Sequence, residues 1–265
     1  MAFPPVRTLI MAPAQWATID AFQSIEATVG TLYDETEYPL LNLVDNKTQA
    51  MCRFTTASAG IKVTFGDPRP LKILGLFNHN LDPQLLIEVY VDDLLLPRTF
   101  GVQYPHCWID LRGFSETPTD AEASLTATTV EVRVYGNSRP VALSEFAAGD
   151  AYVFDGLMEV PFPEAYGTTQ QRVYTDAQVT KAWGSGSHTR VLTLQLQVSA
   201  DALPDLQAVM DAVEEDERVI VVPSSRINQI WLAHWPAQLN RTYTASDRVM
   251  AVPLELIEDV MGVLP

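Results

Sequence analysis

Strict alternation of apolar and polar residues is the feature that most constrains the fold of this chain. In the segment "TTVEVRVYG", Val130, Val132 and Val134 alternate with polar residues such as Glu131, which we expect to face solvent. Successive side chains of a strand point to opposite faces, so this pattern predicts a strand with one buried face. The segment "GIKVTF" at residues 60–65 follows the same rule. These segments therefore predict sheets rather than helices.

The same pattern extends over much of the first half of the chain. Between residues 38 and 155, strand-like segments are separated by turn residues, and no long helical pattern interrupts them. We predict an antiparallel β-sandwich of the jelly-roll kind there. Residues 1–37 are expected to form an N-terminal arm without a fold of its own. Residues 156–170 hold two closely spaced prolines and are expected to be a linker.

The remainder, residues 171–265, predicts a second β-rich domain with one amphipathic helix. Ser199 is a candidate cap for that helix, and an apolar stripe that includes Leu206 and Val209 predicts its buried face. Before it, two long strands are expected to pair across a glycine-serine turn at residues 184–187. The fold class is thus mainly β, a sandwich followed by a β-rich domain with one helix.

The formal charge of −16, from 17 basic and 33 acidic residues, opposes binding to a nucleic acid backbone. Apolar stretches such as residues 71–77 are far shorter than the ~20 residues of a membrane-spanning helix. The N-terminus lacks the pattern of a signal peptide, so synthesis and use without processing are expected. Cys52 and Cys107 are expected to be two buried thiols, with one disulfide as the alternative.

Sequence motifs for catalysis are absent. There is no phosphate-binding glycine loop, no nucleophile elbow, no paired-histidine zinc motif, and the four histidines are scattered. We therefore expect neither a metal nor another cofactor, and we do not expect an enzyme. Asp92-Asp93 is interpreted as a hairpin turn, and a pair of catalytic carboxylates across a cleft is a weak alternative.

Six residues are candidate contacts for a partner or a glycan. Two are histidines at predicted strand ends, and two are tryptophans four residues apart that share a strand face, as an aromatic platform or as core. Two are glutamates at the carboxyl end of the predicted helix, where the dipole disfavours negative charge, so water or a cationic patch on another copy is expected beside them. The six are His79, His106, Trp231, Trp235, Glu214 and Glu215.

Three segments together resemble a known family. "NLVDNKTQAMCRFTT", "AGIKVTFGDPRPLKILGLFNHNL" and "TTVEVRVYG" are similar to the discoidin-like, galactose-binding-like β-sandwich found in minor tail proteins of long-tailed bacteriophages. In that pattern a strand ends in Phe65-Gly66, a proline-bearing turn follows, and an apolar strand ends in Asn78-His79-Asn80. The second half is similar, in element order alone, to the tail-tube and distal-tail fold.

The resemblance implies a structural virion protein, a minor tail or distal-tail component that joins the tail tube to the tip or baseplate. Its expected partners are other copies of itself in a ring and neighbouring tail proteins, without nucleic acid or a membrane span. Its expected location is the virion tail, assembled in the host cytoplasm. The alternative is a carbohydrate-binding module that attaches to a host glycan. On either reading, Asn78 and Asn80 are expected to hydrogen-bond turn backbone after the apolar strand.

Overall fold

The computed structural model describes residues 8–11, 23–44, 50–97, 99–102, 106–111, 125–154, 164–168, 171–174, 180–183, 188–199, 203–212, 218–222, 231–234, 242–243 and 249–260. Nearly every regular element in these residues is a β-strand, and every strand pair is antiparallel. The prediction of a mainly β fold is confirmed. None of the helices in these ranges has the length and apolar character needed to cross a bilayer.

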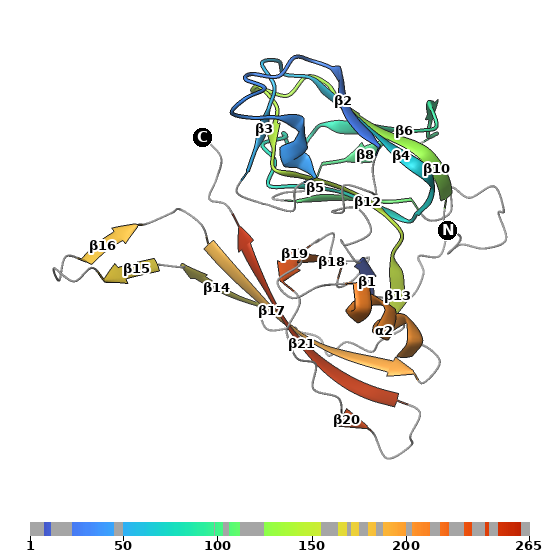
Figure 1. The fold of residues 1–265 in the computed structure, drawn as a ribbon, viewed down its shortest axis with the longest axis vertical. Coiled ribbons are helices and arrows are strands. Elements are labelled where there is room, and N and C mark those ends of the chain that lie inside the picture. Colours follow the sequence, from blue (N-terminus) through green and yellow to red (C-terminus); the bar gives the residue numbers. More distant parts are fainter. Residues whose placement is uncertain are drawn as a thin grey trace.

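Two facing layers form the sandwich in the first half of the chain (Figure 1). The first layer has the strand order β2-β4-β10-β6-β7, with β8 also paired to β6. Its strands are β2 (Ser24–Val29), β4 (Ala59–Leu71), β6 (Leu86–Val91), β7 (Leu94–Leu95), β8 (Phe100–Gly101) and β10 (Leu125–Val134). The second layer has the order β12-β5-β9, from β5 (Ile73–Phe77), β9 (Cys107–Asp110) and β12 (Glu145–Gly149). Beside these lie the pair β3 (Cys52–Arg53) and β11 (Ala142–Leu143) and the 3-10 helix η1 (Leu40–Leu43).

The core of the sandwich lies between these layers. The apolar face predicted for β10 is buried at Val130, Val132 and Val134, and β4 buries its own alternating set. Every residue of β5 is buried, as expected of a strand whose run of apolar residues does not alternate. Phe54, Phe77 and Phe146 are among the largest fully buried side chains. The period of the sequence therefore predicted the buried faces correctly.

Glu131 is the exception, because its side chain is buried and does not face solvent as we expected. Arg133 donates to both of its carboxylate oxygens, at 2.6 and 2.9 Å, and Thr28 Oγ1 also donates to it. The Arg133 guanidinium lies 4.2 Å from the centre of the Tyr90 ring. Burial raises the pKa of Glu131, but the hydrogen bonds from Arg133 and Thr28 outweigh it and leave the pKa below its usual value.

The predicted proline-bearing turn after Phe65-Gly66 is also different in the structure. Strand β4 continues through both prolines to Leu71. Thr64 pairs with Thr129 and Arg69 pairs with Ala127, so several residues of β4 bulge opposite one residue of β10. Pro68 is tolerated there because a bulge does not need every ladder N–H, and Pro70 lies beyond the bulge, opposite Thr126.

Asp92-Asp93 forms the predicted hairpin turn between β6 and β7. Both residues have positive φ, 46° and 65°, as a two-residue type I′ turn requires. The Asp92 carboxylate accepts hydrogen bonds from the backbone N–H groups of Thr128 and Thr129, at 2.9 and 2.8 Å. It also accepts from Thr128 Oγ1 at 2.7 Å. The carboxylate thus ties the turn to β10.

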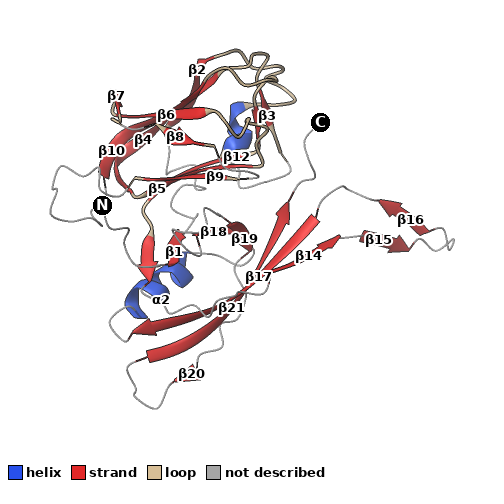
Figure 2. Cartoon of the chain, turned by 180° about the vertical axis from the view of Figure 1, so that it is seen from behind, coloured by secondary structure: helices blue, strands red, loops and turns tan. Residues whose placement is uncertain are grey.

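A second sheet contains most of the described strands after residue 150, in the lower part of Figure 1. Its order is β13-β1-β18-β19-β21-β17-β14, with β20 beside β21. The strands are β1 (Thr8–Met11), β13 (Tyr152–Phe154), β14 (Glu164–Thr168), β17 (His188–Ser199), β18 (Arg218–Val222), β19 (Trp231–His234), β20 (Thr242–Tyr243) and β21 (Val249–Val260). The hairpin of β15 (Gln171–Tyr174) and β16 (Thr180–Trp183) lies apart from this sheet in both views (Figure 2).

The predicted helix is α2 (Leu203–Ala212), beside β13 (Figure 1), and it buries Leu206 and Val209 as its stripe predicted. The expected cap is wrong, because Ser199 is the last residue of β17. The expected pairing before the helix is also wrong: β16 pairs with β15, and β17 pairs with β14 and β21. The glycine-serine segment 184–187 lies outside the described residues.

The segment predicted to be an arm, residues 1–37, contributes to both sheets. Strand β2 pairs with β4 in the sandwich, and β1 pairs with β13 and β18 in the second sheet. Likewise β14 lies within the predicted linker 156–170 and pairs with β17. Short strands such as these do not show which distant segment they will join, so their membership was not predictable from pattern. The domain boundaries at residues 38, 156 and 171 stay a prediction.

Candidate functional site

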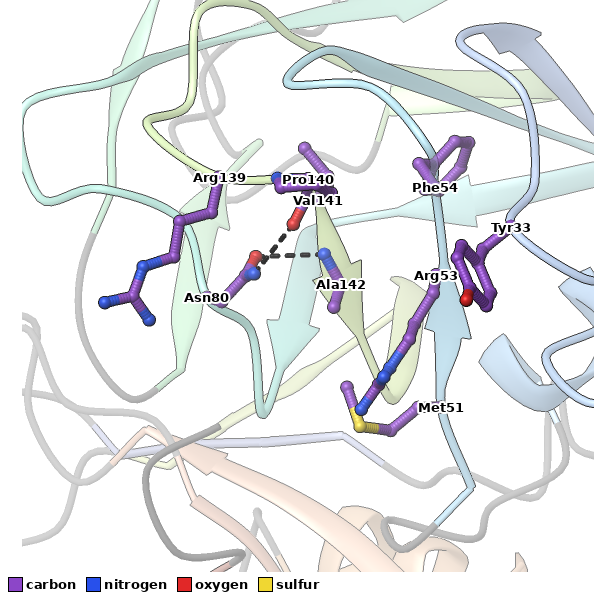
Figure 3. A pocket seen from close by; sticks show the side chains of 9 residues that line it. All are labelled: Tyr33, Met51, Arg53, Phe54, Asn80, Arg139, Pro140, Val141 and Ala142. Atoms are coloured by element: carbon purple, nitrogen blue, oxygen red, sulfur yellow. Dashed lines mark hydrogen bonds between the residues drawn. The ribbon is translucent and has the colours of Figure 1, made fainter. Parts of the chain in front are cut away.

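A half-open pocket of about 330 Å³ lies at one end of the sandwich, around β3 and β11 (Figure 3). Its walls come from four separate segments of the chain, which the β3–β11 pair and the ends of β5 and β2 bring together. The lining residues are Tyr33, Met51, Arg53, Phe54, Asn80, Arg139, Pro140, Val141 and Ala142. Phe54 and Val141 are buried and form its floor, whereas Tyr33 and Arg139 are exposed at its rim.

Asn80 builds one wall of the pocket. Its side chain donates to the carbonyl of Pro140 at 2.8 Å and accepts from the N–H of Ala142 at 2.9 Å (Figure 3). The Asn80 N–H also donates to the Ala142 carbonyl at 3.1 Å. Asn137 extends the same wall, because its side-chain amide donates to the carbonyl of Arg139 at 2.9 Å. We expected Asn80 to bind the turn directly after the apolar strand, but its side-chain partners belong to the distant segment Pro140–Ala142, which lines the pocket.

Asn78 and His79, which precede Asn80, are buried, and so is His106. Asn78 has a φ of 44°, and its N–H donates to Nδ1 of His106 at 3.1 Å. Nδ1 of His79 accepts from the N–H of Leu81 at 3.2 Å. His79 and His106 are only 2% and 3% exposed, so neither ring is at the surface of the pocket. Their observed role is to bind backbone in the loops after β5, and direct contact with a partner or glycan stays a prediction.

An aromatic and cationic cluster forms the opposite rim. Tyr33 is 65% exposed, and its ring forms a T-shaped pair with the Tyr38 ring, at 6.1 Å between centres. The Arg53 guanidinium carbon lies 4.7 Å from the centre of the Tyr38 ring. The Tyr38 hydroxyl donates to Glu37 at 2.8 Å, and this hydrogen bond raises the pKa of Tyr38 above its usual value. Tyr33 and Arg53 are also tied by backbone, since the Tyr33 N–H donates to the Arg53 carbonyl at 2.8 Å.

These groups can bind a polar ligand that has an apolar face. Exposed tyrosine rings stack on flat apolar surfaces, and arginines supply fixed forks of N–H donors. The lining residues include no carboxylate, histidine, serine or cysteine. In the part of the chain that the structure describes, no three metal-binding side chains gather at one place.

Comparisons with known proteins give likenesses in structure and none in sequence. No protein-family model matches the chain, and no curated protein matches its sequence. The family 32 carbohydrate-binding module of NanJ from Clostridium perfringens, solved with galactose, is similar over 53% of this chain and 98% of its own, at 10% identity and a TM-score of 0.38. A second Clostridium perfringens carbohydrate-binding module, solved with GalNAc-β-1,3-galactose, is similar over 48% of this chain and 95% of its own, at 10% identity and a TM-score of 0.37.

A fucosidase from Ruminococcus gnavus, solved with fucose, is also similar, at 12% identity and a TM-score of 0.39. The likeness covers 52% of this chain and only 26% of the fucosidase. At such identities and scores the likenesses establish no family and no function for this chain. The argument about function therefore rests on the pocket and on the sheets.

The other predicted contact residues lie away from this pocket or outside the description. Trp231 is the first residue of β19, where its backbone pairs with Val221. Trp235, Glu214 and Glu215 fall outside the described residues, so their roles as partner or glycan contacts stay predictions.

Sequence reasoning missed Tyr33, Arg53 and Arg139. Tyr33 belongs to the segment that we expected to be an N-terminal arm, and Arg53 and Arg139 are isolated arginines. Their only shared property is their position in the fold, because β3 and β11 join segments that are far apart in the sequence. The spacing of these three residues along the chain therefore could not predict that they line one pocket.

Both cysteines are free and fully buried, as expected. Burial raises the pKa of the Cys52 thiol to about 12. The Cys107 thiol donates to the carbonyl of Gly101 at 3.7 Å. A thiol with such a pKa is not nucleophilic near neutral pH, so Cys52 serves the core of the sandwich.

Proposed function

We propose that the sandwich is a carbohydrate-binding domain whose site is the pocket between Tyr33 and Arg139. The observation that carries this proposal is the combination of an exposed tyrosine and two arginines around an apolar floor. A sugar ring presents a flat C–H face for the tyrosine and hydroxyl groups for the N–H donors. The pocket's volume, about 330 Å³, lies at the lower end of the range common for ligand sites.

The wall that Asn80 fixes supports the same proposal. Its two hydrogen bonds hold the Pro140–Ala142 backbone, so the site is preformed and loses little entropy when a ligand binds. Asn80 then contributes both to the fold of the sandwich and to the shape of the proposed binding site. The Asn78–Asn80 segment shapes the pocket without itself carrying out any reaction.

A binding experiment with two tyrosine variants tests this proposal. A glycan array identifies ligands of the parent protein, and calorimetry measures their affinity for Tyr33→Ala and for the control Tyr135→Ala. Tyr135 is also exposed, at 45%, but does not line the pocket. Losing a stacking ring is expected to weaken binding roughly tenfold for Tyr33→Ala, from about 1.5 kcal/mol. No glycan binding by the parent, or equal weakening by both variants, would refute the proposal.

A second candidate function is a structural one, in which copies of the chain join as a ring in a phage tail. A separate observation favours it: β17 pairs with β21 along its whole length, but β14 pairs only with His188–Leu192. Within the described residues, the other edge of Thr193–Ser199 has no strand beside it. An open edge of this length is a template for strand addition by another chain.

The register identifies which backbone groups face this open edge. Gln195 of β17 lies opposite Pro253 of β21. Pro253 has no N–H, so this is expected to be a position where the two strands exchange no hydrogen bonds, and the Gln195 N–H then points away from β21. Gln195→Pro removes that donor while leaving the β17–β21 ladder intact.

Native mass spectrometry of the full chain tests assembly. If the ring forms by strand addition, the parent protein is a defined oligomer and Gln195→Pro is a folded monomer. The matched variant Leu194→Pro removes a ladder N–H and is expected to damage the sheet itself. A parent protein that stays monomeric at high concentration, or an oligomer that Gln195→Pro leaves unchanged, would refute assembly through this edge.

A further inference from the structure

The charge of the pocket differs in sign from that of the chain. The protein carries a formal charge of −16, yet the residues that line the pocket include two arginines and no acid. Figure 3 shows the two guanidinium groups on either side of Asn80 and Ala142. Arg53 comes from β3 and Arg139 from the loop before β11, so two separate segments each bring one positive charge to the same cavity.

Neither arginine is neutralised by the part of the chain that the structure describes. The salt bridges there join other residues, and the Arg53 guanidinium lies on the Tyr38 ring. A cation stacked on an aromatic face keeps its N–H groups at the edge, where they are free to bind an anion. The fork of Arg53 is thus oriented by the protein before a ligand arrives.

Three acids on the flanking loops, Asp34, Glu37 and Asp82, are hydrogen-bonded by other groups. The Asp34 carboxylate accepts the backbone N–H groups of Thr36 and Glu37, at 2.8 and 3.2 Å, which lowers the pKa of Asp34. The Asp82 carboxylate accepts from the N–H and hydroxyl of Ser138, at 2.6 and 2.9 Å. Glu37 accepts the Tyr38 hydroxyl. Asp34 and Glu37 therefore have partners in their own loop, and Asp82 has its partner in the loop that carries Arg139.

From this we infer that the pocket selects sugars that bear an oxyanion, a carboxylate or a sulfate, over neutral sugars. The inference rests on the proposed carbohydrate-binding function and adds the class of ligand. Planar guanidinium groups bind the two oxygens of such an anion with paired hydrogen bonds, which are stronger than bonds to a hydroxyl. Tyr33 would cover the ring of the sugar that carries the anion.

Calorimetric titration of the full chain with matched sugars tests this inference. The probes are tri-galacturonate, neutral galactotriose, and galactose 6-sulfate beside galactose. We expect tri-galacturonate or the sulfated sugar to bind at least tenfold more tightly than its neutral match. The two anionic probes distinguish a carboxylate ligand from a sulfate ligand.

Three variants assign the preference to the pocket. Arg139→Gln and Arg53→Gln are expected to remove most of the preference, and Arg139→Lys tests whether charge alone suffices. The control Lys62→Gln removes one positive charge outside the pocket, where Lys62 forms a surface ion pair with Asp93, and should leave the preference unchanged. Circular dichroism checks that each variant is folded.

The possible outcomes distinguish a failure of this inference from a failure of the proposed carbohydrate-binding function. If neutral and anionic sugars bind equally, or if Lys62→Gln lowers the preference as much as Arg139→Gln, the inference is wrong while carbohydrate binding stands. If no sugar of either kind binds here and none binds on the array, both are wrong.

Discussion

Replacing Asn80 by alanine is expected to destabilise the sandwich more than an ordinary polar substitution does. The change removes two hydrogen bonds, one to the Pro140 carbonyl at 2.8 Å and one from the Ala142 N–H at 2.9 Å. A hydrogen bond contributes a net ~1 kcal/mol, and leaving a buried partner unsatisfied adds to the loss. Ala142 is buried, so its N–H is left without easy access to water. We expect the free energy of unfolding to fall by about 2–3 kcal/mol.

Two further variants show which part of this loss belongs to each hydrogen bond. Asn80→Asp keeps the acceptor for Ala142 and loses the donor to Pro140. Asn42→Ala removes a single hydrogen bond, from its side-chain amide to the Met51 carbonyl at 2.7 Å, so a loss of about 1 kcal/mol is expected. The free energy of unfolding of both variants should therefore lie between that of the parent and that of Asn80→Ala.

Urea unfolding followed by tryptophan fluorescence measures these differences, with Trp108 in β9 as a buried reporter in the sandwich. The unfolding midpoint of Asn80→Ala should fall by about 1 M if the slope of the transition is near 2–3 kcal/mol per molar. A midpoint within error of the parent would refute the role assigned to Asn80. So would a loss no larger than that of Asn42→Ala.

Three other predictions concern the sandwich. Cys52, whose burial raises its pKa to about 12, should react with a thiol reagent at pH 8 only after denaturation, and early labelling of native protein would contradict its burial. Glu131 has a lowered pKa, so it stabilises the fold above its ordinary value of 4.5 and this contribution is lost as pH falls through the lower folded value. The midpoints of the parent and Glu131→Gln should therefore converge in acid, and a constant difference would contradict the ion pair with Arg133. Gly30→Ala should cost at least 1 kcal/mol, because φ is 82° and a Cβ would meet the Ser58 carbonyl. The control Gly101→Ala has open space, and equal melting temperatures for the two would refute this account.

The buried faces of the strands were predictable because alternation reports which side of a strand is apolar. Glu131 shows where that reasoning ends: its position in the alternation is an outward one, but Thr28 and Arg133 cover it. Thr28 lies 103 positions from Glu131, and a pattern within one strand holds no information about such a neighbour. The burial of Glu131 depends on β2 joining the other edge of β4, which brings Thr28 within reach of Glu131 across β4.

The features of the candidate site, too, were in part predictable from the sequence and in part decided by the fold. The sequence by itself determined that Asp92-Asp93 would form a hairpin and that the two thiols would be buried, because each depends on local turn chemistry or on residue type. It did not determine the partners of the Asn80 side chain, which lie about 60 positions further along the chain. Only the tertiary structure decided that Tyr33, Arg53 and Arg139 share a cavity, and that, among the strands the structure describes, β14 pairs with only the first part of β17. The physical reason is that strand pairing is non-local: apolar period selects a face for each strand, but the partner is chosen by the packing of the whole chain.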